Sequence, residues 1–279
     1  MATVTDFEHG QIIFADGYEC FYRYWPGQRG AVLYLHGIQS HGLWFEGSAS
    51  RLAEAGYAVL LPDRRGSGRN RRDRGDDPGG HWLADLGELC AVLKRRASAS
   101  RIHLVGVSWG GKLATVFGRH RSDLLASLTL VAPGIYPLVD VSLWDKMAIA
   151  LCGLGAPRRQ FPIPLNEPEL FTDNPQRQEF IRADANRLTT VTSRFLCRSH
   201  FLDRHARVFD QRFTFPVKLF LAGRDRIIDN RSTLELFRSW HAPRKQLRYY
   251  PHASHTLEFE SNPETHFDDL VEWIDYVAS

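Results

Sequence analysis

A strand-like run, a tight turn and a helix-like run follow one another in the segment Ile102-His103-Leu104-Val105-Gly106-Val107-Ser108-Trp109-Gly110-Gly111-Lys112-Leu113-Ala114-Thr115-Val116-Phe117. At its centre, Ser108 stands two residues from Gly106 and two from Gly110, which is a Gly-x-Ser-x-Gly pattern. A sharp strand-to-helix turn holds such a serine in strained backbone geometry, and the glycines let neighbouring backbone pass close by. The bare pattern is weak, but a strand before it and a helix after it are the context it requires. The segment therefore predicts a nucleophile elbow with Ser108 as the nucleophile.

A serine hydroxyl also needs a base that accepts its proton and a carboxylate that orients the base. After an elbow serine, the acid and then the histidine come later in the chain. Asp225 follows the apolar run 217–221, and His255 follows the run 246–250. Because the carboxyl ends of parallel strands meet at one edge of a sheet, we predict a triad of Ser108, Asp225 and His255.

Both partners have neighbours that could compete for these roles. Asp229 lies at an expected helix start, where its ordinary role is capping. His252 still adjoins the strand, whereas His255 opens the segment leading to the last helix. The two histidines could bind a metal only with a third ligand, and none is apparent nearby. The preferred residues remain Asp225 and His255, and no metal site is expected.

The run Leu35-His36-Gly37-Ile38-Gln39 follows another expected strand and supplies the remaining part of the site. An oxyanion is held by the backbone N–H after the nucleophile and by a second N–H from an early loop. These donors are predicted to be Trp109 and Ile38. Gly37 allows close approach of the loop, and His36 is interpreted as a structural turn residue.

Alternating strands and helices indicate an α/β fold, with a mostly parallel, doubly wound sheet. A hairpin is expected from 11–15 and 19–24 around Asp16-Gly17. The further expected strands are 31–35, 57–61, 102–107, 128–131, 217–221 and 246–250. They are apolar on both faces, as in sheets covered by helices. The expected helices are 42–55, 81–96, 109–120, 230–240 and 263–277.

One stretch, 135–213, interrupts this alternation because it contains no clear strand. Prolines at 157, 162, 164, 168 and 175 divide it into short pieces. A structureless loop of this length is unusual in a compact domain, so we predict a helical cap inserted over the sheet. Residues 1–134 and 214–279 then form one core. Candidate substrate-binding residues are Gln39, Tyr136 and Trp144.

Composition limits the class of protein. The chain has 279 residues, of which 43% are hydrophobic and 24% charged, which is typical of a soluble globular protein. A net charge of +3 is too small to indicate a nucleic-acid partner. The arginine-rich run 64–74 is interpreted as a solvated loop.

Residues 1–6 show no secretory leader pattern, and no apolar run reaches the roughly 18–20 residues needed to cross a bilayer. The four cysteines are widely spaced and form no CxxC pair. A reduced, cytoplasmic protein is therefore expected.

Five motifs carry a resemblance that extends over nearly the whole core, from about residue 10 to 277. They are His36-Gly37 with Ser40-His41 and Trp44, Asp63-Arg64-Arg65-Gly66-Ser67-Gly68, Gly106–Gly111, Gly223-Arg224-Asp225-Arg226, and Ala253-Ser254-His255-Thr256-Leu257. With them the chain resembles the α/β-hydrolases, more narrowly the monoacylglycerol lipase and lysophospholipase branch of serine hydrolases. The resemblance implies a triad acting through an acyl-enzyme, and a helical cap between the sixth and seventh core strands. It also implies a small-molecule acyl ester as substrate, with neither a metal nor an organic cofactor.

Trp109 departs from the Met or Gln usual in the lipase-like branch and is similar to proline iminopeptidases. Their His-Gly-Gly-Pro-Gly loop, however, is not matched by residues 36–40. Haloalkane dehalogenases also carry this Trp, but they have Asp where Ser108 stands. The open alternatives are an aminopeptidase, a thioesterase or carbon–carbon bond hydrolase on the same triad, and a non-catalytic ligand-binding protein. An aminopeptidase requires an acid in the cap to hold the substrate amine, and the candidates are Glu167, Glu169, Asp173 and Glu179.

Overall fold

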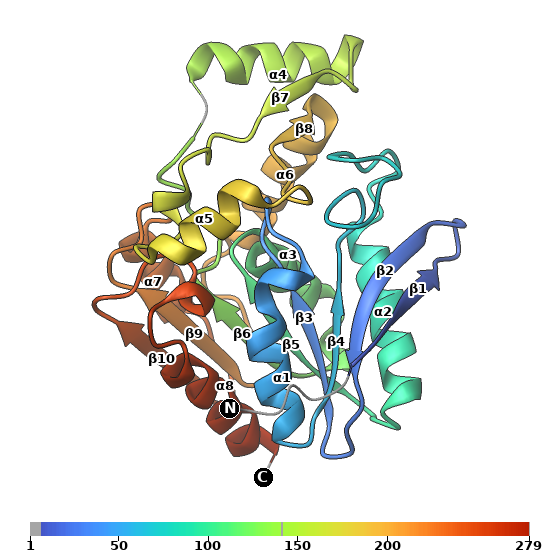
Figure 1. The fold of residues 1–279 in the computed structure, drawn as a ribbon, viewed down its shortest axis with the longest axis vertical. Coiled ribbons are helices and arrows are strands. Elements are labelled where there is room, and N and C mark those ends of the chain that lie inside the picture. Colours follow the sequence, from blue (N-terminus) through green and yellow to red (C-terminus); the bar gives the residue numbers. More distant parts are fainter. Residues whose placement is uncertain (1–6, 141, 279) are drawn as a thin grey trace.

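A mostly parallel β-sheet of eight strands forms the centre of the molecule (Figure 1). The structure is a computed structural model and describes residues 7–140 and 142–278. The sheet strands are β1 (Glu8–Ile13), β2 (Glu19–Trp25), β3 (Ala31–Leu35), β4 (Ala58–Pro62), β5 (Ile102–Val107), β6 (Leu125–Val131), β9 (Val217–Ala222) and β10 (Lys245–Tyr250). Their order is β1-β2-β4-β3-β5-β6-β9-β10. Within this sheet only the pairings of β2 with β1 and with β4 are antiparallel, so the carboxyl ends of β3, β4, β5, β6, β9 and β10 share one edge.

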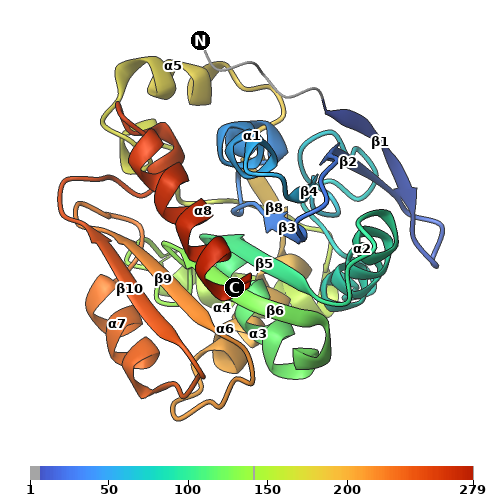
Figure 2. The same cartoon turned by 90° about the horizontal axis from the view of Figure 1, so that it is seen from below.

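Helices cover both faces of this sheet (Figure 2). On one face α1 packs against α8, and on the other lie α2, α3 and α7. Their bounds are α1 (Glu46–Glu54), α2 (Trp82–Arg96), α3 (Trp109–His120), α7 (Asn230–Ser239) and α8 (Glu264–Ala278). Burial on both faces explains why β3, β4 and β5 consist almost entirely of buried residues. The expected doubly wound α/β architecture is therefore confirmed.

Element boundaries agree closely where the hydrophobic signal is strong. The strands expected at 31–35 and 102–107 and the helix at 109–120 coincide with β3, β5 and α3. Strand β10 differs, because most of its residues are exposed or half-exposed. As the last strand of the sheet it pairs only with β9, and one edge of it remains open.

The segment 135–213, here called the insert, lies between β6 and β9, the sixth and seventh strands of the sheet along the chain. It carries α4 (Leu143–Gly155), α5 (Pro175–Ala183) and α6 (Ser193–Ala206). The sequence shows no clear strand in this stretch, but the structure contains two short ones. Strands β7 (Gln160–Pro162) and β8 (Thr190–Thr192) form a separate antiparallel pair. Three residues are too few to show alternation in a sequence, which is why this pair escapes a periodicity search.

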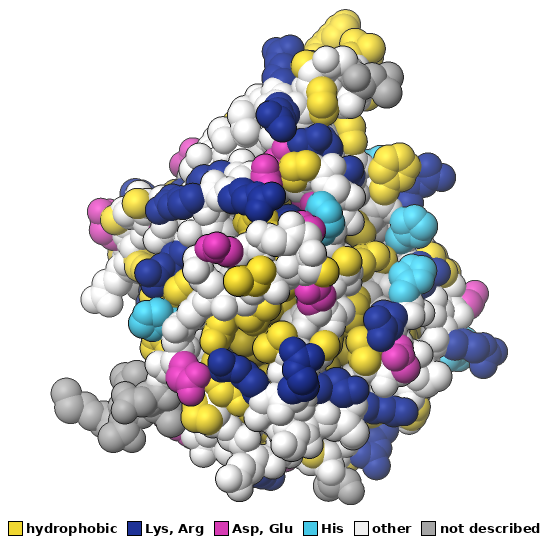
Figure 3. All heavy atoms as spheres, turned by 90° about the vertical axis from the view of Figure 1, so that its right-hand side faces the viewer, with side chains coloured by type: hydrophobic (Ala, Val, Ile, Leu, Met, Phe, Trp, Pro, Cys, Tyr) yellow, Lys and Arg dark blue, Asp and Glu magenta, His cyan; other side chains and the backbone are white. Residues whose placement is uncertain are grey.

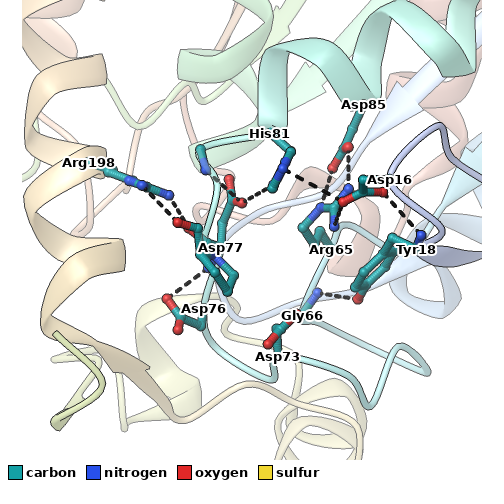
Figure 4. Close-up of polar contacts among 12 residues, drawn as sticks. Asp16, Tyr18, Arg65, Gly66, Asp73, Asp76, Asp77, His81, Asp85 and Arg198 are labelled. Atoms are coloured by element: carbon teal, nitrogen blue, oxygen red, sulfur yellow. Dashed lines mark hydrogen bonds and ion pairs between the residues drawn. The ribbon is translucent and has the colours of Figure 1, made fainter.

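The arginine-rich run 64–74 is only partly solvated, which corrects the prediction for it. The Arg65 side chain is 2% exposed and binds the carboxylates of Asp16 and Asp85 at 2.7–2.8 Å. Figure 4 shows these two acids converging on Arg65. Ion pairs supplied by distant segments make its burial possible. Arg69, Arg71 and Arg72 are exposed, as expected.

The outer side of the insert presents apolar side chains to solvent. Trp144 on α4 is 79% exposed and Leu151 is 72% exposed. Figure 3 shows hydrophobic side chains gathered at the top of the molecule, the end at which Figure 1 places α4. Within 7–140 and 142–278, no helix combines the length and the hydropathy that crossing a membrane requires. Residues 1–6, on which the expectation about a leader rests, lie outside the described residues.

Candidate active site

Ser108 stands at the turn between β5 and α3 in a strained backbone conformation. Its φ of 51° and ψ of −120° are unusual for a residue with a side chain. Three backbone bonds secure the turn: Ser108 donates to Val131 O, and its own carbonyl accepts from the N–H groups of Gly111 and Gly134. A Cβ at Gly106 would lie 2.7 Å from the carbonyl oxygen of Gly110, so this close passage requires glycine.

His255 and Asp225 meet at the carboxyl edge of the sheet. The Nδ1 atom of His255 lies 2.7 Å from Oδ2 of Asp225, and the two side chains are 2% and 0% exposed. The other carboxylate oxygen accepts the N–H groups of Ile227 and Ile228 at 2.8 and 3.0 Å. The carboxylate can therefore hold the ring in the tautomer that has its proton on Nδ1. Among the described residues, Nε2 of His255 is buried without a hydrogen-bond partner, so this nitrogen remains available as a base.

The alternatives to these two residues have other positions. Asp229 caps α7, since its carboxylate accepts the N–H groups of Arg231 and Ser232. This is the capping role expected of it. His252 is exposed, whereas His255 is buried.

The loop after β3 lies against Ser108. A Cβ added to Gly37 would be 3.3 Å from Cβ of Ser108. His36 is buried and structural: Nδ1 bonds the carbonyl of Gly37, and Nε2 accepts the N–H of Arg64 at 2.8 Å. Burial, and then the nearby Arg64 cation, lower the pKa of His36 to about 3, so it remains neutral.

The two backbone donors predicted for an oxyanion belong to the residues that follow Gly37 and Ser108, which lie against each other. Ile38 follows Gly37, and Trp109 follows Ser108. Within the described part of the chain, neither N–H donates a hydrogen bond to a protein acceptor. Both are therefore available to a bound group.

The Trp109 side chain joins α3 to the insert. Its indole N–H donates to Ser199 on α6 at 2.9 Å, and its ring stacks on Phe195 of α6 at 5.6 Å. Arg64, in the loop that follows β4, places its guanidinium 4.6 Å from the centroid of the Trp109 ring. The ring of Trp82 meets the Trp109 ring edge-on. The large residue after the nucleophile is thus used in packing, while its backbone N–H stays unbonded.

The predicted substrate-binding residues occupy three different environments. Gln39 is 1% exposed, and its side-chain oxygen accepts from Arg187 of the insert. Tyr136 is half-buried, with the Arg207 guanidinium over its ring. Trp144 is on the exposed side of α4.

Two residues next to the site were not found by sequence reasoning. Phe171 of the insert meets the His255 ring edge-on at 6.2 Å, and its carbonyl accepts the N–H of Thr256. The side chain of Asp184, in the insert, is 4% exposed and binds side chains of the loop after β3. Neither follows a strand or belongs to a motif, so no local signal marks them.

The described residues contain no group of three or more His, Cys, Asp or Glu side chains that could hold a metal ion. The chemical groups at the site are a hydroxyl, an oriented imidazole and backbone donors. Such a set can perform nucleophilic acyl transfer.

The sheet order, the elbow after β5 and the buried acid–histidine pair define an α/β-hydrolase. Residues 26–262 match the family described as "Serine aminopeptidase, S33" (Hydrolase_4), and the chain belongs to this family.

Curated relatives carry several activities. The "Non-heme chloroperoxidase CPO-A1" of Kitasatospora aureofaciens is 32% identical over 117 residues, covering 42% of this chain and 41% of that protein. The "Proline iminopeptidase" of Lactiplantibacillus plantarum is 30% identical over 161 residues, covering 54% and 53%. The "Thermostable monoacylglycerol lipase" of a Bacillus species is 28% identical over 112 residues, covering 40% and 44%. The chain thus spans about half the length, or less, of these relatives.

Solved structures share the whole fold. The monoacylglycerol lipase of Paleococcus ferrophilus has a TM-score of 0.84 at 19% identity, covering 93% of this chain and 99% of that one. A soluble variant of monoglyceride lipase from Saccharomyces cerevisiae also has a TM-score of 0.84 at 19% identity, covering 100% and 97%. At this identity the likeness concerns the fold.

Proposed function

We propose that the protein is a serine hydrolase that cleaves carboxylic esters through an acyl-enzyme. The observation that carries the proposal is the buried pair of Asp225 and His255, in which Nε2 of His255 has no hydrogen-bond partner among the described residues. Acyl transfer also requires a nucleophile and an oxyanion donor. Ser108 stands in strained elbow geometry, and the loop after β3 lies against it and carries the available N–H of Ile38. Each of these parts has a defined role in acyl transfer.

In the first half-reaction, His255 removes the hydroxyl proton of Ser108 while the oxygen attacks the ester carbonyl. The Asp225 carboxylate stabilises the imidazolium that forms. Backbone N–H groups of Ile38 and Trp109 bind the oxyanion. The imidazolium then protonates the leaving alcohol, and in the second half-reaction His255 activates water, which releases the acid and regenerates the hydroxyl.

The insert would act as a cap that receives the acyl group of a monoacyl lipid or a small acyl ester. Phe171 brings an aromatic ring of the insert against His255. Small-molecule pockets are mostly apolar, with few polar groups. Structures that share the fold include two monoacylglycerol lipases, which supports this substrate class.

An aminopeptidase is less well supported, although a curated relative and the family description name one. The amine of such a substrate needs an available acid in the insert. Glu169 and Glu179 both pair with Arg182, and Asp173 pairs with arginines 224 and 226. Glu167 is exposed. These candidates are surface groups, and most already have cationic partners.

A panel of substrates tests the proposal. Rates are compared for p-nitrophenyl esters of increasing acyl length, monoacylglycerols, lysophospholipids, aminoacyl amides and acyl thioesters. Ester hydrolysis should dominate, and Ser108→Ala should abolish it without lowering the thermal midpoint of unfolding. Wild-type rates in Ser108→Ala, or a clear preference for aminoacyl amides, would overturn the proposal.

A further inference from the structure

A short segment of the insert, residues 184–188, holds the loop that follows β3. This loop contains Ile38, the proposed oxyanion donor, and runs on to Trp44. The contacts between segment and loop come from two side chains and one backbone group. They make the loop's shape depend on a part of the chain that is remote in sequence.

Asp184 provides the first of these contacts. Its side chain is 4% exposed, and its Oδ2 atom accepts from Nε2 of His41 at 2.9 Å and from the indole N–H of Trp44 at 2.7 Å. Although burial opposes ionisation, these hydrogen bonds lower the pKa of Asp184 below its usual value. A charged acceptor with two buried donors fixes both side chains strongly.

The second contact is made at Gln39, next to Ile38. The N–H of Leu188 donates to the Gln39 carbonyl at 2.9 Å, and Nε of Arg187 donates to the Gln39 side-chain oxygen at 3.0 Å. Arg187 is itself held by the carbonyl of Leu165 at 2.6 Å. Gln39 is therefore fixed at both its backbone and its side chain.

From these contacts we infer that Asp184 is a positioning residue for the oxyanion hole. It acts through His41 and Trp44 on the loop whose Ile38 N–H meets the developing charge. The inference rests on the proposed function. Donors of this kind act only when they lie about 2.7–3.1 Å from the oxyanion, so a small shift of the loop reduces transition-state binding. The insert then contributes to catalysis even for substrates too short to touch it.

The test compares Asp184→Ala with a control variant at a second buried carboxylate, Asp76→Asn, which is also the counterpart of the rescue variant Asp184→Asn. Asp76 is also a buried carboxylate that joins the core to the insert, because it accepts from Thr192 and Arg194. Its loop carries no proposed oxyanion donor, and Figure 4 shows Asp76 beside Asp77 in that loop. Both variants should lose stability, but only Asp184→Ala should impair the chemical step.

The substrate is p-nitrophenyl acetate, whose acyl group is too short to need the insert. Asp184→Ala should lower kcat by about tenfold or more with KM within threefold, since losing one oxyanion donor outright costs about 10²–10³. The inhibition constant of an alkyl boronic acid, which mimics the tetrahedral intermediate, should rise by a similar factor. Asp76→Asn should keep kcat and the inhibition constant within threefold of wild type.

Asp184→Asn provides the rescue. Its amide oxygen can accept from Trp44, and its NH₂ can donate to Nε2 of His41 after a tautomer change, because Nδ1 of His41 has no partner among the described residues. The N–H of Asn186, which donates to Oδ1 of Asp184 at 2.9 Å, then loses its acceptor. Asp184→Asn should therefore restore part of kcat, to a value clearly above that of Asp184→Ala. If Asp184→Ala does not fold, Arg187→Met removes the side-chain bond to Gln39 and should lower kcat several-fold.

Two results would overturn the inference, provided that the wild-type enzyme is active. In the first, the variants Asp184→Ala and Arg187→Met fold and both keep the full wild-type kcat. In the second, Asp76→Asn loses as much kcat as Asp184→Ala does. A wild type without esterase activity contradicts the proposed function instead, so the two failures are distinguishable.

Discussion

The imidazole of His255 and the carboxylate of Asp225 form a buried hydrogen bond of 2.7 Å between segments that follow two neighbouring strands, β10 and β9. The second oxygen of the carboxylate is held by two backbone N–H groups. The acid therefore cannot turn away from the ring, and the ring can present only Nε2 as a base.

Asp225→Asn should keep the fold and lose most of the activity. The amide oxygen can still accept the N–H groups of Ile227 and Ile228, so its NH₂ would face Nδ1 of His255 and favour the wrong tautomer. We expect kcat to fall by about 10³–10⁴ on a short ester. Stopped-flow assays of the wild type and long-time assays of the variant measure the change in kcat, and thermal unfolding controls for a loss of fold. A loss of less than tenfold would contradict a catalytic role for the Asp225–His255 pair.

Two glycines of the site should respond differently to alanine. At Gly37 the new methyl group would lie 3.2 Å from Oγ of Ser40 and 3.3 Å from Cβ of Ser108, which is tight but adjustable. Gly37→Ala should fold and lower kcat/KM by about tenfold or more, because the loop moves relative to the nucleophile.

At Gly110 the methyl group would lie 2.5 Å from the backbone oxygen of His36, which cannot yield. Gly110→Ala should therefore be insoluble or strongly destabilised. The thermal midpoints of unfolding of the two purified variants are compared by circular dichroism, and their kcat/KM values are compared on a short ester. An unfolded Gly37→Ala beside a stable Gly110→Ala would mean that the packing described around the elbow is wrong.

A buried ion pair joins the nucleophile helix to the insert. Nζ of Lys112 lies 2.5 Å from Oδ1 of Asp203 on α6, and the side chains are 5% and 15% exposed. Lys112→Met leaves the carboxylate without its cation and should lower the free energy of unfolding by about 3 kcal/mol. The double variant Lys112→Met/Asp203→Leu should recover part of this loss. Urea unfolding of the two single variants and the double variant gives the coupling energy, and simple additivity would show that the pair does not interact.

Glu258 should make stability depend on pH. Burial raises the pKa of Glu258 to about 7, against hydrogen bonds from the N–H and hydroxyl of Ser48. Its unfolded pKa is about 4.3. Because the native state holds the proton more tightly, this group's stabilisation is full below about pH 4 and is lost as pH rises through about 7.

Glu258→Gln removes this titration. The free energy of unfolding of the variant minus that of wild type should therefore increase between pH 5 and 8, by up to about 1.4 kcal/mol per pH unit. Guanidinium titrations at four pH values measure the difference. A difference independent of pH would contradict a raised pKa.

Local position explains why some of the site could be predicted. Asp225 and Asp229 stand four residues apart after one strand, yet one adjoins the strand end and the other precedes a helix. Those positions alone separate the residue that meets His255 from the residue that caps α7. The elbow around Ser108 is equally local, since its strand, turn and helix are contiguous.

Other features depend on partners that no local pattern reveals. Arg65 lies in a run that is typical of a solvated loop, but acids from two other elements surround it. Asp184 has an ordinary polar neighbourhood in the sequence, and its donors come from the loop after β3. Strands β7 and β8 form only because the chain brings two three-residue pieces together.

Covalent labelling tests the central claim most directly. A fluorophosphonate reacts with an activated serine hydroxyl, forming a phosphorus–oxygen bond and releasing fluoride. Mass spectrometry of the digested protein should find one adduct, on the peptide that contains Ser108. Ser108→Ala should give none, and His255→Ala should react at least 100-fold more slowly. An adduct on another serine, or undiminished labelling of Ser108→Ala, would contradict the assignment of Ser108 as the nucleophile.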